Sequence, residues 1–247
     1  MDLNIKAARK FIFHFSFFIL LFTFFEADVM AQQVSKYVKI EVQQEVFLES
    51  RFLLYLPDGY DTLDRQWPLL LFLHGRGESG DVIELVKKNG PPKMIEFGRE
   101  FPFIVVSPQC PAEQDWSVDV LNMLLGEMTS HYKVDTNQIW VSGLSMGGKG
   151  TWDLALANPG KFAAIVPICG WTDTSKAALL KDLPIWVFHG AKDDIVPLTA
   201  SEEMVNALKS LGSPVKFTVY PDAGHDSWTE TYDNPELWKW LEEQKRK

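Results

Sequence analysis

The segment QIWVSGLSMGGKGTWDLA, residues 138–155, decides the fold. It begins with a short apolar run typical of a buried strand, passes through Gly143-Leu144-Ser145-Met146-Gly147, and ends in a helical pattern. A serine on a tight turn between a strand and a helix has a strained backbone, which exposes its Oγ at the end of the sheet. Glycines on either side leave room for such a turn. The segment therefore predicts a strand–turn–helix unit with Ser145 as a nucleophile.

Short apolar runs alternate with helical patterns on both sides of this unit. The expected strands are residues 37–42, 47–56, 69–73, 103–106, 139–141, 164–168, 185–188 and 217–220. The first two alternate apolar and polar residues, as half-buried antiparallel strands do; the other six are continuously apolar, as in a parallel sheet covered on both faces. The helical patterns are residues 82–88, 118–131, 148–157, 201–211 and the chain from Pro235 onward. This alternation predicts a three-layer α/β sandwich around a mostly parallel sheet of about eight strands.

A serine hydroxyl is a weak nucleophile and needs a base, usually histidine. When the serine lies on such a turn, the chain order is serine, acid, histidine, and the histidine follows the last strand. His225, in the stretch DAGHD of residues 222–226, has this place. His74 precedes the serine, His131 ends a polar helix, and His189 ends a strand and is typical of a packed, hydrogen-bonded histidine.

The acid is expected after the strand at residues 185–188, where the chain reads HGAKDDIVP. Asp193 and Asp194 both have a suitable position, but only one carboxylate can face the imidazole and stabilise its charged form. We favour Asp193. Asp194 is then an exposed loop carboxylate or a helix cap.

Two backbone N–H groups are needed to hold the oxyanion that forms when a carbonyl is attacked. One is expected from Met146, directly after the serine, and the other from Arg76 in the loop HGRGE that follows the strand at residues 69–73. The side chain of Arg76 has three open roles: exposure to solvent, pairing with Glu78, or contact with a substrate.

Six stretches between residues 69 and 232 carry a resemblance to a known group: LLLFLHGRGESG, FIVVSPQCP, IWVSGLSMGGKGTWDLA, FAAIVPICG, WVFHGAKDDIVP and YPDAGHDSWTETY. They resemble secreted bacterial members of the α/β-hydrolase superfamily, described as phospholipase/carboxylesterase-like, feruloyl-esterase-like or predicted peptidases. The resemblance extends over roughly residues 37–241. It implies that Ser145, Asp193 and His225 form a catalytic triad, and it indicates the reaction class better than the substrate.

Many α/β-hydrolases carry a helical cap between the sixth and seventh strands. Only residues 169–183 separate those strands here, too few for a cap domain, so we expect an open site. Trp116 and Trp171 lie on loops at the catalytic edge and either stack on an aromatic or sugar group of the substrate or pack within the fold. An open site with aromatic edges in an exported protein suggests feruloyl or acetyl esters of plant polysaccharide.

The first residues have the pattern of a secretory signal. Lys6, Arg9 and Lys10 precede an apolar run at residues 11–25, and Val29-Met30-Ala31 resembles a cleavage site. The run is shorter than the roughly 20 residues of a membrane-spanning helix, so cleavage after Ala31 is favoured over an uncleaved anchor. The expected product is one catalytic domain, residues 32–247, which is secreted or periplasmic and has no further membrane association.

Composition and charge exclude several partners. The formal net charge of −9 and the lack of a basic patch argue against nucleic acid. Cys110 and Cys169 follow strands expected to lie about 14 Å apart, so two buried free thiols are favoured over a disulfide. The spacing of cysteine and histidine predicts no metal site, and no cofactor is required. Oligomeric state is not predicted.

These features favour a serine carboxylic-ester hydrolase that acts on a small-molecule or polysaccharide-linked ester through an acyl-enzyme. A serine peptidase of the prolyl-oligopeptidase type is one alternative, because the stretch HGAKDD also resembles those catalytic domains. A non-catalytic binding protein on the same fold is another, although retention of Ser145, Asp193 and His225 argues against it.

Overall fold

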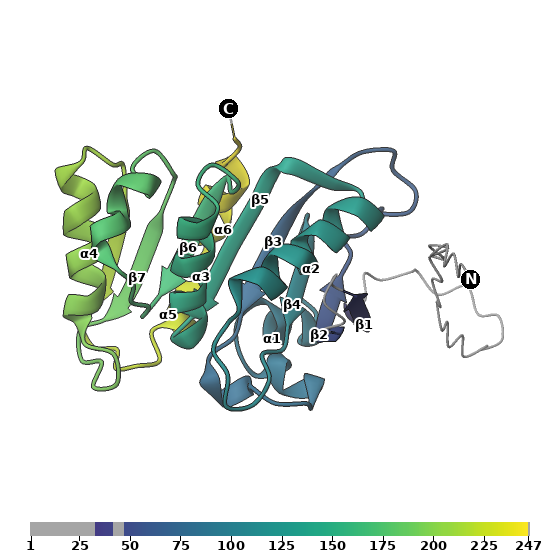
Figure 1. Ribbon diagram of the computed structural model, residues 1–247, viewed down its shortest axis with the longest axis horizontal. Helices are drawn as coiled ribbons and strands as arrows, with labels where there is room; N and C mark the ends of the chain where they lie inside the picture. The colour runs from purple at the N-terminus through teal and green to yellow at the C-terminus, as the bar shows by residue number, and fades with distance from the viewer. Residues whose placement is uncertain (1–32, 42–46, 247) are drawn as a thin grey trace, which may run out of the picture.

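One mixed sheet organises the part of the chain that the computed structural model describes, residues 33–41 and 47–246 (Figure 1). Its strands are β1 (Gln33–Glu41), β2 (Phe47–Tyr55), β3 (Trp67–Leu73), β4 (Ile104–Pro108), β5 (Val134–Leu144), β6 (Ala164–Ile168), β7 (Trp186–Gly190) and β8 (Lys216–Tyr220). Their spatial order is β1-β2-β4-β3-β5-β6-β7-β8. The eight-stranded sheet is confirmed, while the expected signal peptide at residues 1–31 lies outside the described residues.

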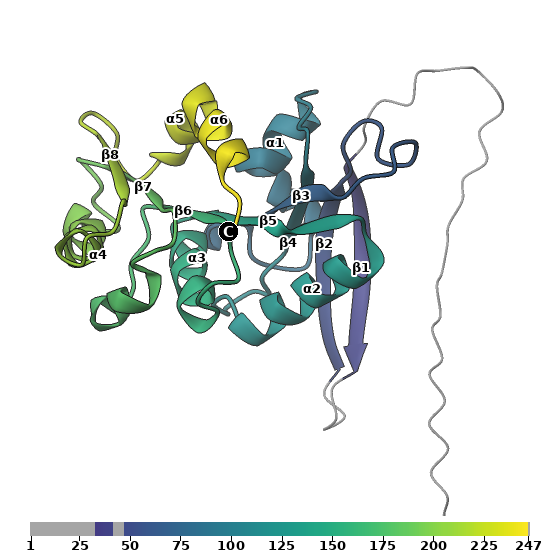
Figure 2. The same ribbon diagram turned by 90° about the horizontal axis from the view of Figure 1, so that it is seen from above.

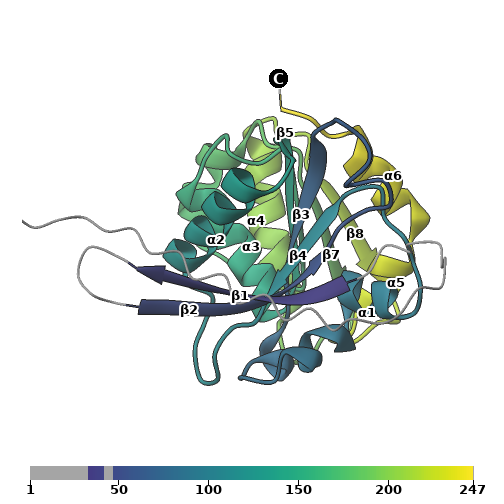
Figure 3. The same cartoon turned by 90° about the vertical axis from the view of Figure 1, so that its right-hand side faces the viewer.

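Strand direction also follows the expectation. β2 runs antiparallel to both β1 and β4, and all neighbouring pairs from β4 to β8 are parallel. Figure 3 looks at the edge where β1 and β2 lie side by side. The carboxyl ends of β3, β5, β7 and β8 therefore share one edge of the sheet, where α/β proteins place their binding sites.

Helices cover both faces of the sheet. Figure 2 shows one layer made of α2 (Val118–His131), α3 (Met146–Ala157) and α4 (Leu198–Ser210), and an opposite layer made of α1 (Gly90–Glu96), α5 (Trp228–Asp233) and α6 (Pro235–Glu243). Three 3₁₀ turns complete the described chain: η1 (Arg76–Glu78), η2 (Ile83–Lys88) and η3 (Thr174–Leu180). This is the three-layer α/β sandwich that the sequence predicts.

The central strands divide their side chains between two cores. Leu69, Leu71 and Leu73 of β3 pack in the core below α2, α3 and α4, whereas Leu70 and Phe72 pack in the core of the opposite layer. All five side chains are fully buried. Burial on both faces is the reason that this strand reads as a continuous apolar run rather than an alternating one.

Several short helical elements differ from the expectation. The helix expected at residues 82–88 is the 3₁₀ turn η2 at residues 83–88, and a separate helix, α1, follows it with prolines in its first turn. The elements α1, α5 and η3 are not predicted by the sequence patterns. Among the described residues, no helix is long and apolar enough to cross a membrane.

Candidate active site

Ser145 occupies the turn between β5 and α3. Its φ of +54° and ψ of −116° lie in a region that non-glycine residues rarely adopt. The strained turn is held by a hydrogen bond of 2.9 Å from the Ser145 N–H to the carbonyl of Ile168 on β6. Strain of this kind persists only where surrounding structure enforces it, and it often marks a functional position.

The two motif glycines are required by close backbone contact. A Cβ on Gly147 would lie 1.9 Å from the carbonyl oxygen of Leu73, and one on Gly143 would lie 2.3 Å from the oxygen of Gly147. Both distances are shorter than any real Cβ contact. The glycines therefore let the start of α3 approach the end of β3, which brings the loop after β3 beside Ser145.

His225 reaches the serine from the loop after β8. Its Nε2 lies 2.9 Å from Ser145 Oγ, and its Nδ1 lies 3.0 Å and 2.9 Å from the two carboxylate oxygens of Asp193. A carboxylate only accepts hydrogen bonds, so Nδ1 carries the proton and Nε2 is free to accept one from the serine hydroxyl. The structure thus brings together the three residues expected to form a triad.

Asp193 is held in a fully buried, hydrogen-bonded position. Its Oδ1 accepts hydrogen bonds of 2.9 Å from the N–H groups of Ile195 and Val196. Burial alone would raise the pKa of Asp193, but the hydrogen bonds from His225 and these amides outweigh it, so the pKa is lowered. Asp194 is exposed on the same loop. The geometry therefore distinguishes two aspartates that the sequence leaves close to equivalent.

His189, on β7, contacts the carboxylate of Asp193. It is fully buried, with Nε2 placed 2.9 Å from the carbonyl of Val196 and 3.2 Å from Asp193 Oδ2, and Nδ1 placed 2.7 Å from Ser201 Oγ. The interpretation of His189 as a packed, hydrogen-bonded histidine is confirmed. Its contact with Asp193 has no signal in the sequence beyond their spacing of four residues.

The two expected oxyanion donors lie beside the serine. Met146 is the first residue of α3, where helix geometry leaves the N–H without a partner inside the helix, and Arg76 is the first residue of η1. Both line the same cavity as Ser145. The Arg76 side chain forms an ion pair with Asp115 at the surface, so the alternative of pairing with Glu78 is wrong.

Ser145 and His225 line a cavity of about 690 Å³, while the Asp193 side chain is buried behind them. Its wall is mostly apolar and comprises Leu144, Met146, Trp171, Ile195, Val196, Pro197, Ala200 and Trp228 beside the loop at residues 75–78. Trp171 is therefore at the cavity, as expected of a substrate contact. Trp116 is not among the lining residues: its indole donates to the carbonyl of His74 and its ring packs against Gly150.

Trp228 is a cavity residue that the sequence reasoning does not identify. Its ring stands edge-to-face against the His225 imidazole, with centroids 5.2 Å apart. It also lines a second cavity of about 320 Å³ between α1 and α5. Its position three residues after His225 is the signal that could have identified it.

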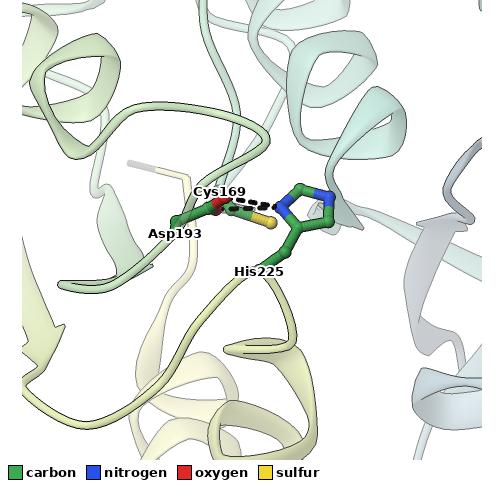
Figure 4. Close-up of side chains that lie close together, drawn as sticks. All are labelled: Cys169, Asp193 and His225. Carbon is green, nitrogen blue, oxygen red and sulfur yellow. Dashed lines mark hydrogen bonds and ion pairs between the residues drawn. The ribbon is translucent and has the colours of Figure 1, made fainter.

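Cys169 lies directly beside the Asp193–His225 pair (Figure 4). Its sulfur, an Asp193 oxygen and a His225 nitrogen lie within 4.8 Å of one another, the one such group found among the described residues. Burial raises the pKa of the Cys169 thiol to about 12, so it stays protonated and is a poor metal ligand, while the other two groups bond to each other. Cys110 is also buried, and both cysteines are free, as expected.

Comparison with known proteins finds esterases and related hydrolases. The sequence profile of the phospholipase/carboxylesterase family matches residues 106–234, just over half of the chain. A solved structure of a thermostable esterase superposes with a TM-score of 0.75 and 32% identity, covering 86% of this chain and 63% of that one.

Two curated fungal relatives are more distant. Acyl-protein thioesterase 1 of Gibberella zeae is 24% identical over 68% of this chain and 87% of its own length. A protein of Aspergillus terreus described as a probable feruloyl esterase C is 24% identical over 63% of this chain and 59% of its own. Other curated relatives are similar over a smaller part of the chain. For example, the match to a protein of Methylorubrum extorquens covers 38% of this chain and 35% of that protein.

Proposed function

This chain belongs to the phospholipase/carboxylesterase family of α/β-hydrolases, and we propose that it hydrolyses carboxylic esters through Ser145, His225 and Asp193. The observation that carries the proposal is the continuous chain of hydrogen bonds Ser145–His225–Asp193, which ends in an apolar cavity. A nucleophile, an unprotonated imidazole nitrogen and a buried carboxylate in this order are the parts that acyl transfer requires.

The first half of the reaction acylates the enzyme. His225 Nε2 takes the proton from Ser145 Oγ as that oxygen attacks the ester carbonyl. The backbone N–H groups of Met146 and Arg76 hold the resulting oxyanion, and Asp193 stabilises the imidazolium. His225 then returns its proton to the leaving alcohol oxygen, and the acyl group remains on Ser145.

The second half repeats these roles with water. His225 Nε2 takes a proton from a water molecule, which attacks the acyl carbonyl. The same N–H groups hold the second oxyanion, and the Ser145 oxygen leaves with the proton from His225. The carboxylic acid departs and the free serine is restored, so no cofactor takes part.

The cavity favours a bulky, apolar acyl or alcohol group. An acetyl group would fill a small part of about 690 Å³, whereas an aromatic acyl group would contact Trp171 and Trp228. Of the two ester classes suggested by the sequence, feruloyl esters therefore fit better than acetyl esters. The similarity to a fungal protein described as a feruloyl esterase supports the same choice.

A panel of substrates tests the proposal. Purified protein would be assayed on p-nitrophenyl acetate, p-nitrophenyl octanoate, methyl ferulate and a proline-containing peptide amide, beside a Ser145→Ala control. We expect turnover of esters that is lost in the variant, with kcat/KM higher for methyl ferulate than for the acetate. Cleavage of the peptide amide alone would favour the peptidase alternative. Ester turnover that survives Ser145→Ala would contradict the mechanism.

We also propose that the protein is exported and that its first 31 residues are removed. The basic residues, short apolar run and small residues at positions 1–31 support this. Mass spectrometry of the protein exported by a bacterial host would give the N-terminus. We expect it at Gln32; retention of residues 11–25 in the cell envelope would favour an anchor instead.

A further inference from the structure

Glu78 is a buried carboxyl group in the wall of the active-site cavity. It ends the turn η1, whose first residue is the proposed oxyanion donor Arg76, and it is 5% exposed. Its one ion-pair contact among the described residues is at 3.9 Å with His74, whose pKa is lowered to about 4 by burial, so that this histidine is neutral. A buried carboxyl without a cationic partner is costly, and such groups are retained at functional sites.

The Glu78 carboxyl begins a chain of contacts that leads to the base. Oε1 of Glu78 accepts a hydrogen bond of 2.7 Å from Asn89 Nδ2, and Asn89 Oδ1 accepts one of 3.3 Å from Trp228 Nε1. An indole N–H only donates, so Asn89 must present its oxygen to Trp228 and its amide nitrogen to Glu78. The ring of Trp228 then stands edge-on to His225.

These contacts connect two parts of the site that lie far apart in the sequence. The turn with Arg76 follows β3, whereas His225 and Trp228 follow β8. Asn89 precedes α1 and lies between them. The second oxygen of Glu78, Oε2, is buried without a hydrogen-bond partner, so Asn89 supplies the side-chain hydrogen bond to this carboxyl.

We propose that Glu78, Asn89 and Trp228 form a positioning network that fixes the oxyanion-binding turn relative to His225. The inference rests on the proposed ester hydrolysis and adds residues to its machinery that touch no reacting atom. Acyl transfer needs the oxyanion donor and the base in fixed relation, and a misplacement of about 1 Å costs on the order of 100-fold in rate.

The test exchanges donor and acceptor. Asn89→Asp places two carboxyl groups against each other. Because burial raises the pKa of Glu78, the assays are run at pH 9, where both groups are ionised and neither can donate, so the link is broken. Adding Glu78→Gln restores it, because the new amide donates to Asp and Asp still accepts from Trp228. We expect kcat to fall about 10- to 100-fold in Asn89→Asp with KM within about twofold, and to return to within about threefold of the original in the double variant. Glu84→Gln, an exposed glutamate on η2, is the matched control.

A second readout is independent of catalysis. The indole ¹⁵N–H resonance of Trp228, assigned by its loss in Trp228→Phe, should shift in Asn89→Asp and return in the double variant. An unchanged resonance, or a double variant no better than Asn89→Asp, would overturn the network. If the resonance behaves as expected but the unchanged protein hydrolyses no ester, the proposed function fails and the network stands. Should Asn89→Asp fail to fold, the double variant must still fold and react.

Discussion

Asp193 combines a buried position with a lowered pKa, and these two features define what it contributes. The carboxylate accepts from His225 and from two backbone amides, and these hydrogen bonds favour its charged form. In Asp193→Asn the charge is lost and the imidazole adopts the wrong tautomer. We expect kcat to fall by about 10³- to 10⁴-fold with little change in KM, measured on the best ester of the panel.

Asp194→Asn is the matched control, because that side chain is exposed on the same loop. Its kcat should stay within about twofold of the original, since solvent screens the charge of an exposed side chain. If the large loss appeared in Asp194→Asn instead, the assignment of the acid would be reversed.

His74 predicts a pH dependence of stability. Its Nε2 accepts from the Cys110 N–H and its Nδ1 lies 2.6 Å from the Gly75 carbonyl, and burial lowers its pKa from 6.5 to about 4. Between these pH values the unfolded chain binds the proton and the folded chain does not, so stability falls as the solution is acidified. The full effect is about 3 kcal/mol and is complete below pH 4.

The measurement is urea unfolding at pH 7 and at pH 4.5, with His74→Gln as the comparison. The variant should be less stable at pH 7, because it loses the packing against Trp116, but it should lose less stability on acidification. An equal loss of unfolding free energy in both proteins would mean that His74 has the same pKa in the folded and the unfolded state.

At the scale of elements, the junction of β5 and α3 depends on glycine. Because a Cβ on Gly147 would lie 1.9 Å from the Leu73 carbonyl oxygen, Gly147→Ala must push α3 away from β3. We expect a loss of stability of at least about 2 kcal/mol and a near-complete loss of activity, because the oxyanion donors move apart. Urea unfolding and ester turnover measure the two effects.

Gly126→Ala controls for the substitution itself. Gly126 lies inside α2 and a Cβ there would meet no atom within 4 Å. This variant should gain about 0.5–1 kcal/mol, since alanine is the better helix former. A comparable loss at both positions would show that contact with Leu73 is not the cause at Gly147.

The sequence predicts the strands and the longer helices, because each has a clear pattern of apolar residues. The strands β3 to β7 have mostly buried side chains, so their apolar runs are distinct, and the turn at Ser145 combines that signal with a glycine motif. The short helices α1 and α5 have seven and six residues, too few for a helical period to emerge. The sequence also gives no signal for the contact of Glu78 with Asn89 or for that of Trp228 with Asn89, because each joins residues that no motif connects.

For the molecule as a whole, the open cavity separates this protein from α/β-hydrolases with a cap. Residues 169–185 between β6 and β7 contain the 3₁₀ turn η3 and no α-helix, so the described chain has no cap domain between these strands. Trp171 and Ile195 at the cavity are 37% and 68% exposed. We therefore expect the residues of the cavity wall, rather than a cap domain, to select the substrate.

The lack of a cap domain predicts that the rate shows no jump when the substrate forms micelles or droplets. Enzymes whose lid opens on aggregated substrate show a jump in rate at the solubility limit, because the surface stabilises the open state. Without a cap that must open, we expect the rate with p-nitrophenyl butyrate to rise along a hyperbola up to the solubility limit and to stay level above it. A lidded lipase assayed in parallel should show the jump. A several-fold rise for this protein at that concentration would mean that residues 169–185, or another loop beside Ile195, close over Ser145 in solution.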